Sequence, residues 1–189
     1  MRKPLLAAVC LVVGAAACNG EDGPAGPEGP PGNANVGSGT ATLASADWLW
    51  NSQWSLESAA GSTTSWFSRY VDIPDALITQ DIVDDGAVLV YFKPVEGQTF
   101  WTPLPFAFVA FGSQYYHQFH YRYDVGNIRL HYFWTPNGGG TVPSGLSTYA
   151  IPDHTFRWVV IAGFTATAMR RDNVPLHDYE AVMRYLAPR

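Results

Sequence analysis

Three tryptophans near the start of the predicted domain could bind a sugar. They are Trp48, Trp50 and Trp54, and the polar residues between or beside them include Asp47, Asn51 and Gln53. An exposed indole ring offers an apolar platform on which a sugar ring can stack, and it has a polar N–H at its edge. We therefore take the three tryptophans as a candidate glycan-binding site. The competing interpretation is that they fill the core or a sheet edge, because large aromatic side chains are usually mostly buried.

The best metal ligands in the sequence are His120 and His131, which we expect on adjacent strands and on one face. A zinc site needs a third and usually a fourth ligand with nitrogen, sulfur or carboxylate donors. The neighbours on that face are Arg122 and Arg129, whose charge opposes a cation. The sequence therefore predicts an exposed polar strand face with no metal and no cofactor. His117 falls among inward aromatic positions, where we expect a partly buried, hydrogen-bonded histidine.

Motifs typical of catalysis are missing from the sequence. It contains no Gly-Xaa-Ser-Xaa-Gly and no His-Glu-Xaa-Xaa-His. The three glycines at 138–140 precede no Lys-Ser or Lys-Thr, so they indicate a hairpin tip and not a phosphate loop. Asp81, Asp84 and Asp85 lack the spacing of a calcium loop and are expected in a turn with a short helical stub. We therefore expect no enzymatic activity.

The N-terminal segment has the features of an export signal. Arg2 and Lys3 precede the apolar stretch Leu5–Ala17, which is shorter than the roughly 20 residues that a membrane-spanning helix needs. Small residues end the stretch, and Cys18 follows directly. The other cysteine, Cys10, lies within the segment to be removed, so a lipidated Cys18 leaves the mature chain without a free thiol. The alternative is a plain secretory signal that leaves Cys18 exposed.

A glycine recurs at every third position from Gly20 to Gly32, with prolines at many of the positions between. This is the collagen pattern, in which only glycine fits where three polyproline II chains meet. Because the triplets are few, we interpret residues 18–35 as the anchor cysteine and a semi-rigid spacer, on the order of 40 Å long at about 3.1 Å per residue. A homotrimer held by this segment stays an open alternative.

This order of segments resembles that of bacterial collagen-like lipoproteins, which have a lipobox cysteine, a short Gly-Xaa-Yaa stalk and a C-terminal β-rich domain of unknown function. The resemblance extends to the segments 79–84, 101–105, 123–129, 156–161 and 179–182. It implies that Cys18 receives a diacylglycerol and becomes the acylated amino terminus. Ala15 departs from the leucine that is most often found three residues before the lipobox cysteine. Asn19, in place of an aspartate directly after that cysteine, resembles lipoproteins that are sent to the outer membrane. The resemblance implies location and build, and no catalytic role.

The composition is that of one aromatic-rich domain. The chain has 189 residues, of which 47% are apolar, 14% aromatic and 14% charged, and this length allows a substantial core. Its net charge of −5 gives no basic surface for nucleic acid. From about Val36 the pattern alternates with a period of two between short turns, and Ala87–Tyr91 and Phe156–Ala162 are apolar runs typical of buried strands.

Local signals complete the predicted fold. Pro103 and Pro105 confine their segment to an edge strand or a bent connection. A helix is indicated by apolar residues at helical spacing, which are Tyr179, Val182, Met183 and Leu186. We predict an all-β fold for residues 36–189: an antiparallel β-sandwich, jelly-roll-like, with one short C-terminal helix.

The sequence also predicts the register of one hairpin and the faces of another strand. The pair Gly126-Asn127 predicts a two-residue hairpin loop that places Tyr123 opposite Leu130. Aromatic residues of this hairpin share a buried face, and the other face carries Gln118, His120, Arg122, Arg129 and His131. Over 66–73, one face is expected to carry Phe67, Val71 and Ile73, and the other Ser68 and Asp72.

The sequence thus predicts three parts: a signal peptide (1–17), the lipidated Cys18 with its spacer (18–35), and a β-sandwich (36–189). The expected protein is anchored by lipid in the cell envelope, at the outer membrane, facing either the periplasm or the outside. We expect a structural, presentation or adhesion role, with the membrane and another envelope protein as partners. The alternative is a glycan-binding module at the cell surface.

Overall fold

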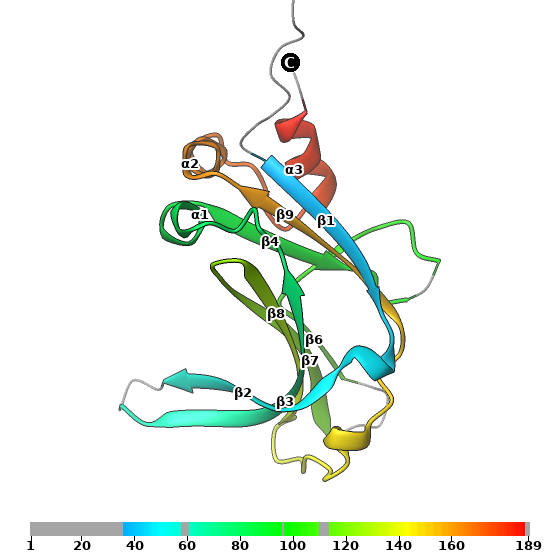
Figure 1. Ribbon diagram of the computed structural model, residues 1–189. Helices are drawn as coiled ribbons and strands as arrows, with labels where there is room; N and C mark the ends of the chain where they lie inside the picture. Colours follow the sequence, from blue (N-terminus) through cyan, green and yellow to red (C-terminus); the bar gives the residue numbers. More distant parts are fainter. Residues whose placement is uncertain (1–35, 58–60, 96, 110–113, 188–189) are drawn as a thin grey trace, which may run out of the picture. The chain divides into compact units, whose positions relative to one another are not determined.

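The computed structural model describes residues 36–57, 61–95, 97–109 and 114–187 (Figure 1). The predicted signal peptide, Cys18 and the spacer lie outside the described residues. In the part that is described, the strands are β1 (Val36–Leu43), β2 (Leu49–Glu57), β3 (Thr63–Pro74), β4 (Ala87–Phe92), β5 (Thr102–Pro103), β6 (Phe106–Val109), β7 (Tyr115–Asp124), β8 (Asn127–Pro136) and β9 (His154–Ile161). The helices are α1 (Gln80–Asp84), α2 (Gly163–Arg171) and α3 (Tyr179–Leu186), with short 3₁₀ turns at Ser45–Asp47 and Leu146–Thr148.

The strands form two antiparallel sheets, which confirms the predicted all-β sandwich. The four-stranded sheet has the order β1-β9-β4-β5, and the five-stranded sheet has the order β2-β3-β8-β7-β6. The first strand pairs with the last, and β3 pairs with β8, which is the nested pairing of a jelly roll. The nesting ends there, because β7 pairs with β6 and β8 inside the five-stranded sheet.

The facing sides of the two sheets form the main core. Its fully buried side chains include Phe92 and Phe156 from one sheet and Phe119, Leu130 and Tyr132 from the other. The outer side of the four-stranded sheet is buried as well, under α2 and α3, through a second cluster. Two of its members are Val159 and Met169. Because β4 and β9 are covered on both sides, they carry the continuous apolar runs that the sequence shows.

One of the two C-terminal helices was predictable. The apolar spacing correctly predicts α3, and the Asp178 carboxylate caps it by accepting a hydrogen bond from the Ala181 N–H at 3.1 Å. The prediction of a single helix is wrong, because α2 precedes it. Its sequence begins with glycine and contains two β-branched threonines, and only Ala166 and Met169 are buried. These residues give little helical signal directly after the apolar β9.

The chain crosses between the sheets at its prolines. Pro103 ends β5 at one edge of the four-stranded sheet, and Phe106 begins β6 at one edge of the five-stranded sheet. Proline lacks the N–H that an interior strand needs, so both strands stay short and lie at edges. The predicted edge strand or bent connection is confirmed.

The β7–β8 hairpin keeps the predicted faces but not the predicted register. The two central turn residues are Val125 and Gly126, so that Tyr123 lies opposite Ile128 instead of Leu130. Gly126 adopts a φ of 76° at the second central position, where a type II turn requires a positive φ. The error is two residues, which leaves every side chain on its face, so alternation alone could not detect it. His117 is inward as predicted, with Nδ1 2.5 Å from the Tyr132 hydroxyl.

A close approach of β1 to β9 explains one glycine. A Cβ on Gly39 would overlap the indole ring of Trp158. That ring cannot turn away freely, because its Nε1 donates a hydrogen bond to the Asp75 carboxylate at 2.6 Å. We expect Gly39→Val to lower the free energy of unfolding by about 1–3 kcal/mol, measured by urea denaturation. The control Ser38→Ala, at an exposed neighbouring position, should change it by less than about 0.5 kcal/mol; equal effects of the two substitutions would contradict the packing argument.

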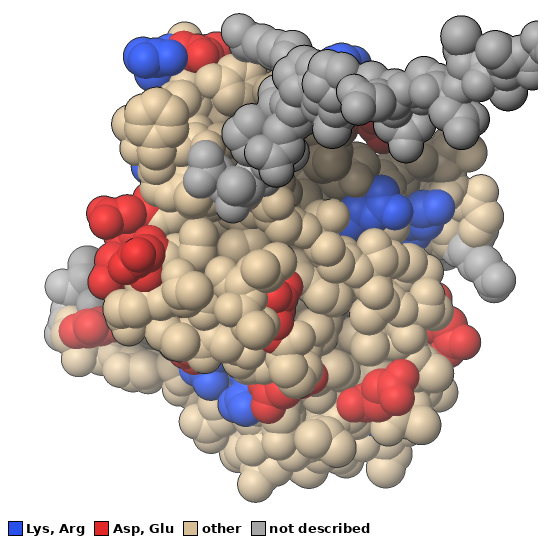
Figure 2. Space-filling model, turned by 45° about the horizontal axis from the view of Figure 1, so that its top comes forward, with Lys and Arg blue, Asp and Glu red and all other residues tan. Residues whose placement is uncertain are grey.

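The surface carries few charges. Figure 2 shows one face on which small groups of charged residues are separated by broad uncharged areas, as the low charged fraction of 14% implies. Within the described residues, none of the helices has the length and apolar character needed to cross a membrane.

Candidate functional site

Exposed apolar side chains gather on the β2–β3 hairpin. Leu49, Trp50, Leu56 and Phe67 are each between 40% and 62% exposed. Residues 63–67 of β3 pair with β2 but not with β8, so this end of the hairpin extends past the rest of the sheet (Figure 1). Exposed apolar patches on soluble domains mark interaction surfaces.

The side of the hairpin that continues the inner face of the sheet borders a cleft of about 450 Å³. Its apolar lining includes Trp50, Phe67, Trp134, Val142, Pro143 and Leu146. The rings of Trp50 and Phe67 lie 6.0 Å apart and tilted by 31°, so they form a broad, partly exposed aromatic surface. The polar side-chain groups in the lining include the hydroxyls of Ser65 and Ser144 and the indole N–H groups of the tryptophans, and no charged side chain is among the described lining residues. The cleft is of a size and character suited to a neutral small ligand or to part of a polymer.

Arg69 fixes to β3 the turn that carries Leu146, one of the residues lining the cleft. It is 8% exposed and lies on β3, two residues from Phe67. Its guanidinium donates hydrogen bonds to the backbone carbonyls of Ser45 at 2.9 Å and of Trp48 and Tyr149 at 2.5 Å. These carbonyls come from the two 3₁₀ turns and their flanks, so one side chain fixes both to β3. Burial lowers the pKa of Arg69 from its ordinary value, yet an arginine remains charged at neutral pH.

The structure separates the three tryptophans. Trp48 is 3% exposed and packs edge-on against Phe119 and Phe156, so it is a core residue and cannot bind a sugar. Trp50 lines the cleft, and Trp54 lies on the opposite face of the sheet. A β-bulge between Leu49 and Ser52, within which Asn51 has a φ of 78°, places Trp50 and Trp54 on opposite faces.

Trp54 covers a histidine pair on the outer face of the five-stranded sheet. His120 and His131 lie on adjacent strands and on one face, as the sequence predicts, and the observed register places them directly opposite each other. Their ring centroids are 4.8 and 5.3 Å from that of Trp54. The prediction of an exposed face is wrong here, because His131 and Ser68 are 0% exposed. Trp54 reaches them from β2 across β3, which shows only once the order of the strands is known.

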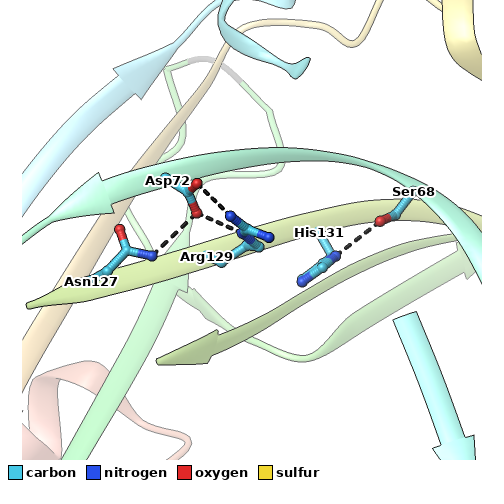
Figure 3. A network of polar contacts seen from close by, with 5 residues as sticks. All are labelled: Ser68, Asp72, Asn127, Arg129 and His131. Atoms are coloured by element: carbon cyan, nitrogen blue, oxygen red, sulfur yellow. Dashed lines mark hydrogen bonds and ion pairs between the residues drawn. The ribbon is translucent and has the colours of Figure 1, made fainter. Parts of the chain in front are cut away.

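The Ser68 hydroxyl and His131 Nδ1 are 2.9 Å apart, which is the geometry of a nucleophile and a base (Figure 3). Burial is the main cause that lowers the pKa of His131 to about 4, followed by the positive charges of Arg122 and Arg129. A neutral histidine could accept the serine proton, but both side chains are sealed from solvent. The pair therefore joins β3 to β8 and offers no access to a substrate.

The adjoining row of this face is an exposed ionic network. The Asp72 carboxylate accepts two hydrogen bonds from Arg129, both at 2.6 Å, and one from the Asn127 amide at 3.2 Å (Figure 3). The hydrogen bond from Arg129 is the largest cause that lowers the pKa of Asp72. The Asp72 carboxylate therefore neutralises the charge of Arg129.

No group of three or more His, Cys, Asp or Glu side chains in the described ranges could hold a metal ion. Asp81 and Asp84 lie in the one-turn helix α1, which confirms the predicted helical stub. Cys18 lies outside the described residues. Of the residues that line the cleft, the sequence indicated a binding role for Trp50 alone, and it placed Phe67 only on one strand face with Val71 and Ile73. The role of Arg69 behind the cleft was not predicted.

Comparison with protein-family models, with curated proteins and with solved structures finds no match to this chain. The assignment of a function therefore depends on the chemistry of the cleft and on the N-terminal sequence.

Proposed function

We propose that this chain is a lipid-anchored adhesion protein of the cell envelope whose β-sandwich binds a neutral glycan in the cleft on the β2–β3 hairpin. The observation that carries the proposal is the exposed pair Trp50 and Phe67. The N-terminal sequence supports the anchor, since Cys18 follows an export signal and a lipobox-like stretch.

A neutral glycan fits the cleft better than a charged ligand does. A sugar ring has an apolar face of C–H groups that can lie on an aromatic surface such as that of Trp50 and Phe67. The hydroxyl of Ser144 can exchange hydrogen bonds with sugar hydroxyls, and so can the remaining capacity of the Ser65 hydroxyl, which also bonds Ser55 at 2.7 Å. A charged ligand would lose hydration in this cleft and gain no counter-charge from the described lining residues.

Binding is tested by affinity electrophoresis through gels that contain hydroxyethylcellulose, xyloglucan or galactomannan, with the acidic alginate as a comparison. We expect retardation in at least one neutral gel. Trp50→Ala and Phe67→Ala should each lower the affinity for that glycan by about tenfold or more, because each removes part of the stacking surface. Their thermal unfolding should stay close to that of the wild type, because neither side chain belongs to the buried core.

The matched control is Leu56→Ala. Leu56 is 62% exposed on the same hairpin but does not line the cleft, so its loss should leave the retardation unchanged. Retardation that is the same for Trp50→Ala as for the wild type, or no retardation in any neutral gel, would refute glycan binding in the cleft.

The anchor is tested separately, by mass spectrometry of the membrane-extracted protein. We expect a mature chain that begins at Cys18 and carries acyl mass, and we expect Cys18→Ala to release an unacylated chain. A soluble wild-type chain cleaved elsewhere would overturn the lipid anchor and leave the glycan test unaffected.

A further inference from the structure

The open edge of β1 is a second surface suited to a partner. Among the described strands β1 pairs only with β9, so the backbone N–H and C=O groups on its other side have no strand partner there. A row of such groups at strand spacing matches one kind of occupant, which is another extended strand.

The other three sheet edges are blunted, and β1 is not. The edge of β2 is interrupted by the bulge at Asn51. β5 has two residues and ends at Pro103, and β6 has four residues and directly follows Pro105. β1 has eight residues in unbroken register with β9, and its sequence VGSGTATL contains no proline and no charge. Bulges, prolines, shortness and charges are the features by which soluble proteins protect their edges.

We infer that the occupant of this edge is β1 of a second copy of the chain, paired antiparallel across a two-fold axis. Identical edges in this orientation satisfy each other's donors and acceptors. No like charges would oppose each other, and the exposed Ser38, Thr40 and Thr42 would form a row of small hydroxyl side chains. The two four-stranded sheets would then form one continuous sheet of eight strands.

The place of β1 in the chain favours β1 of a second copy over a strand of an unrelated protein as the occupant of this edge. β1 begins at Val36, four residues after Gly32, the last glycine of the Gly-Xaa-Yaa repeat. If the proposed lipid anchor holds, copies share one membrane, and β1 is the first element of each domain beyond the spacer. Antiparallel pairing separates the two starts of β1 by about 26 Å, at about 3.3 Å for each of eight residues. The predicted spacer, on the order of 40 Å, is long enough for both copies to reach the same membrane.

Disulfide crosslinking in membranes tests the pairing, with single cysteines introduced at Ser38, Thr40 or Thr42 in the otherwise unaltered full-length chain. In an antiparallel pair only the residue nearest the two-fold axis meets itself, so one position should crosslink at least several-fold more than the others. A mixture of Ser38→Cys and Thr42→Cys chains should form a mixed dimer if Thr40 is that residue. Equal crosslinking at all three positions would indicate a parallel association and overturn the proposal. So would a yield no higher than that of the control Ser55→Cys on β2.

A second measurement covers the case in which the cysteine variants fold poorly. Light scattering of the detergent-solubilised wild type should give the mass of two chains, and the double variant Ser38→Lys with Thr42→Lys should give one. The control, Ser38→Thr with Thr42→Ser, should stay dimeric. A wild type of one or three chains would refute the two-fold pairing. Acyl mass at Cys18 and retention in neutral glycan gels are read independently, so failure of the anchor or of the cleft is distinguishable from failure of the dimer.

Discussion

Replacing Arg69 with methionine is expected to lower the free energy of unfolding by about 3 kcal/mol, because it leaves three carbonyls without their donors at about 1 kcal/mol each. The carbonyls belong to Ser45, Trp48 and Tyr149. Methionine fills a similar volume, so loss of the donors outweighs loss of packing. Lysine retains the charge but offers a single ammonium in place of a planar fork, so Arg69→Lys should also be destabilising. Urea denaturation at neutral pH gives both values.

The matched control is Arg129→Met on the same sheet. Arg129 pairs with Asp72 on the partly exposed outer face, with side chains 27% and 38% exposed. Exposed ion pairs contribute roughly 0–1 kcal/mol, so this variant should remain close to the wild type. We expect Arg69→Met to weaken glycan retention as well, because the turns that flank the cleft lose their common attachment. A change of less than about 0.5 kcal/mol for Arg69→Met would show that the three hydrogen bonds do not stabilise the fold.

The second large effect is a loss of stability in mild acid. The pKa of His131 is about 4 in the folded protein and near 6.5 in the unfolded chain. Between these values the unfolded chain binds a proton that the folded protein does not, so stability falls as the pH falls. The difference corresponds to about 3 kcal/mol, fully present above pH 6.5 and lost as the pH approaches 4.

The environment of His131 sets the direction of this change. Ser68 is its hydrogen-bond partner, Trp54 covers it, and the charges of Arg122 and Arg129 oppose its protonation. Asp72 acts in the opposite sense. The pKa of Asp72 is itself lowered below its ordinary value of 3.8, so its protonation lies outside the pH range of the test.

The measurement is urea denaturation at intervals from pH 7.5 to pH 4.5 for the wild type and for His131→Gln. Burial also lowers the pKa of His117, His120 and His154, so the variant should keep part of the slope and lose the share of His131. A wild-type stability that stays level across this range would contradict the burial of a neutral histidine. The same dependence of stability on pH in both proteins would assign the effect to the other three histidines.

Alternation predicted which side of each strand faces inward, but not where the opposite sheet ends. Phe67, Val71 and Ile73 do share a face, yet Phe67 is 56% exposed because β3 continues past its pairing with β8. Ser68 lies on the outer face as expected and is fully buried, because Trp54 covers that position. Exposure depends on strands that are distant in sequence, and a local pattern carries no information about them.

The candidate site was therefore only partly predictable. The cluster of tryptophans indicated the right segment, and Trp50 lines the cleft. Trp48 lies before β2 and is buried in the core, and Trp54 is on the outer face because the bulge after Leu49 reverses the alternation. A charged residue in an inward row is the one local signal that could have pointed to Arg69. Its carbonyl partners, as far as Tyr149, lie up to 80 residues away along the chain.

The pairing of β1 with β9 also determines when the domain can fold. β9 lies between β1 and β4, and it is synthesised more than a hundred residues after β1 begins. Until β9 has emerged, both neighbours have unpaired edges and the four-stranded sheet cannot close. The nascent domain therefore stays incompletely folded until β9 has been synthesised, and this delay is compatible with the export proposed above. The same delay means that a chain truncated before residue 154 would expose two unpaired edges at once, and we expect it to aggregate or be degraded.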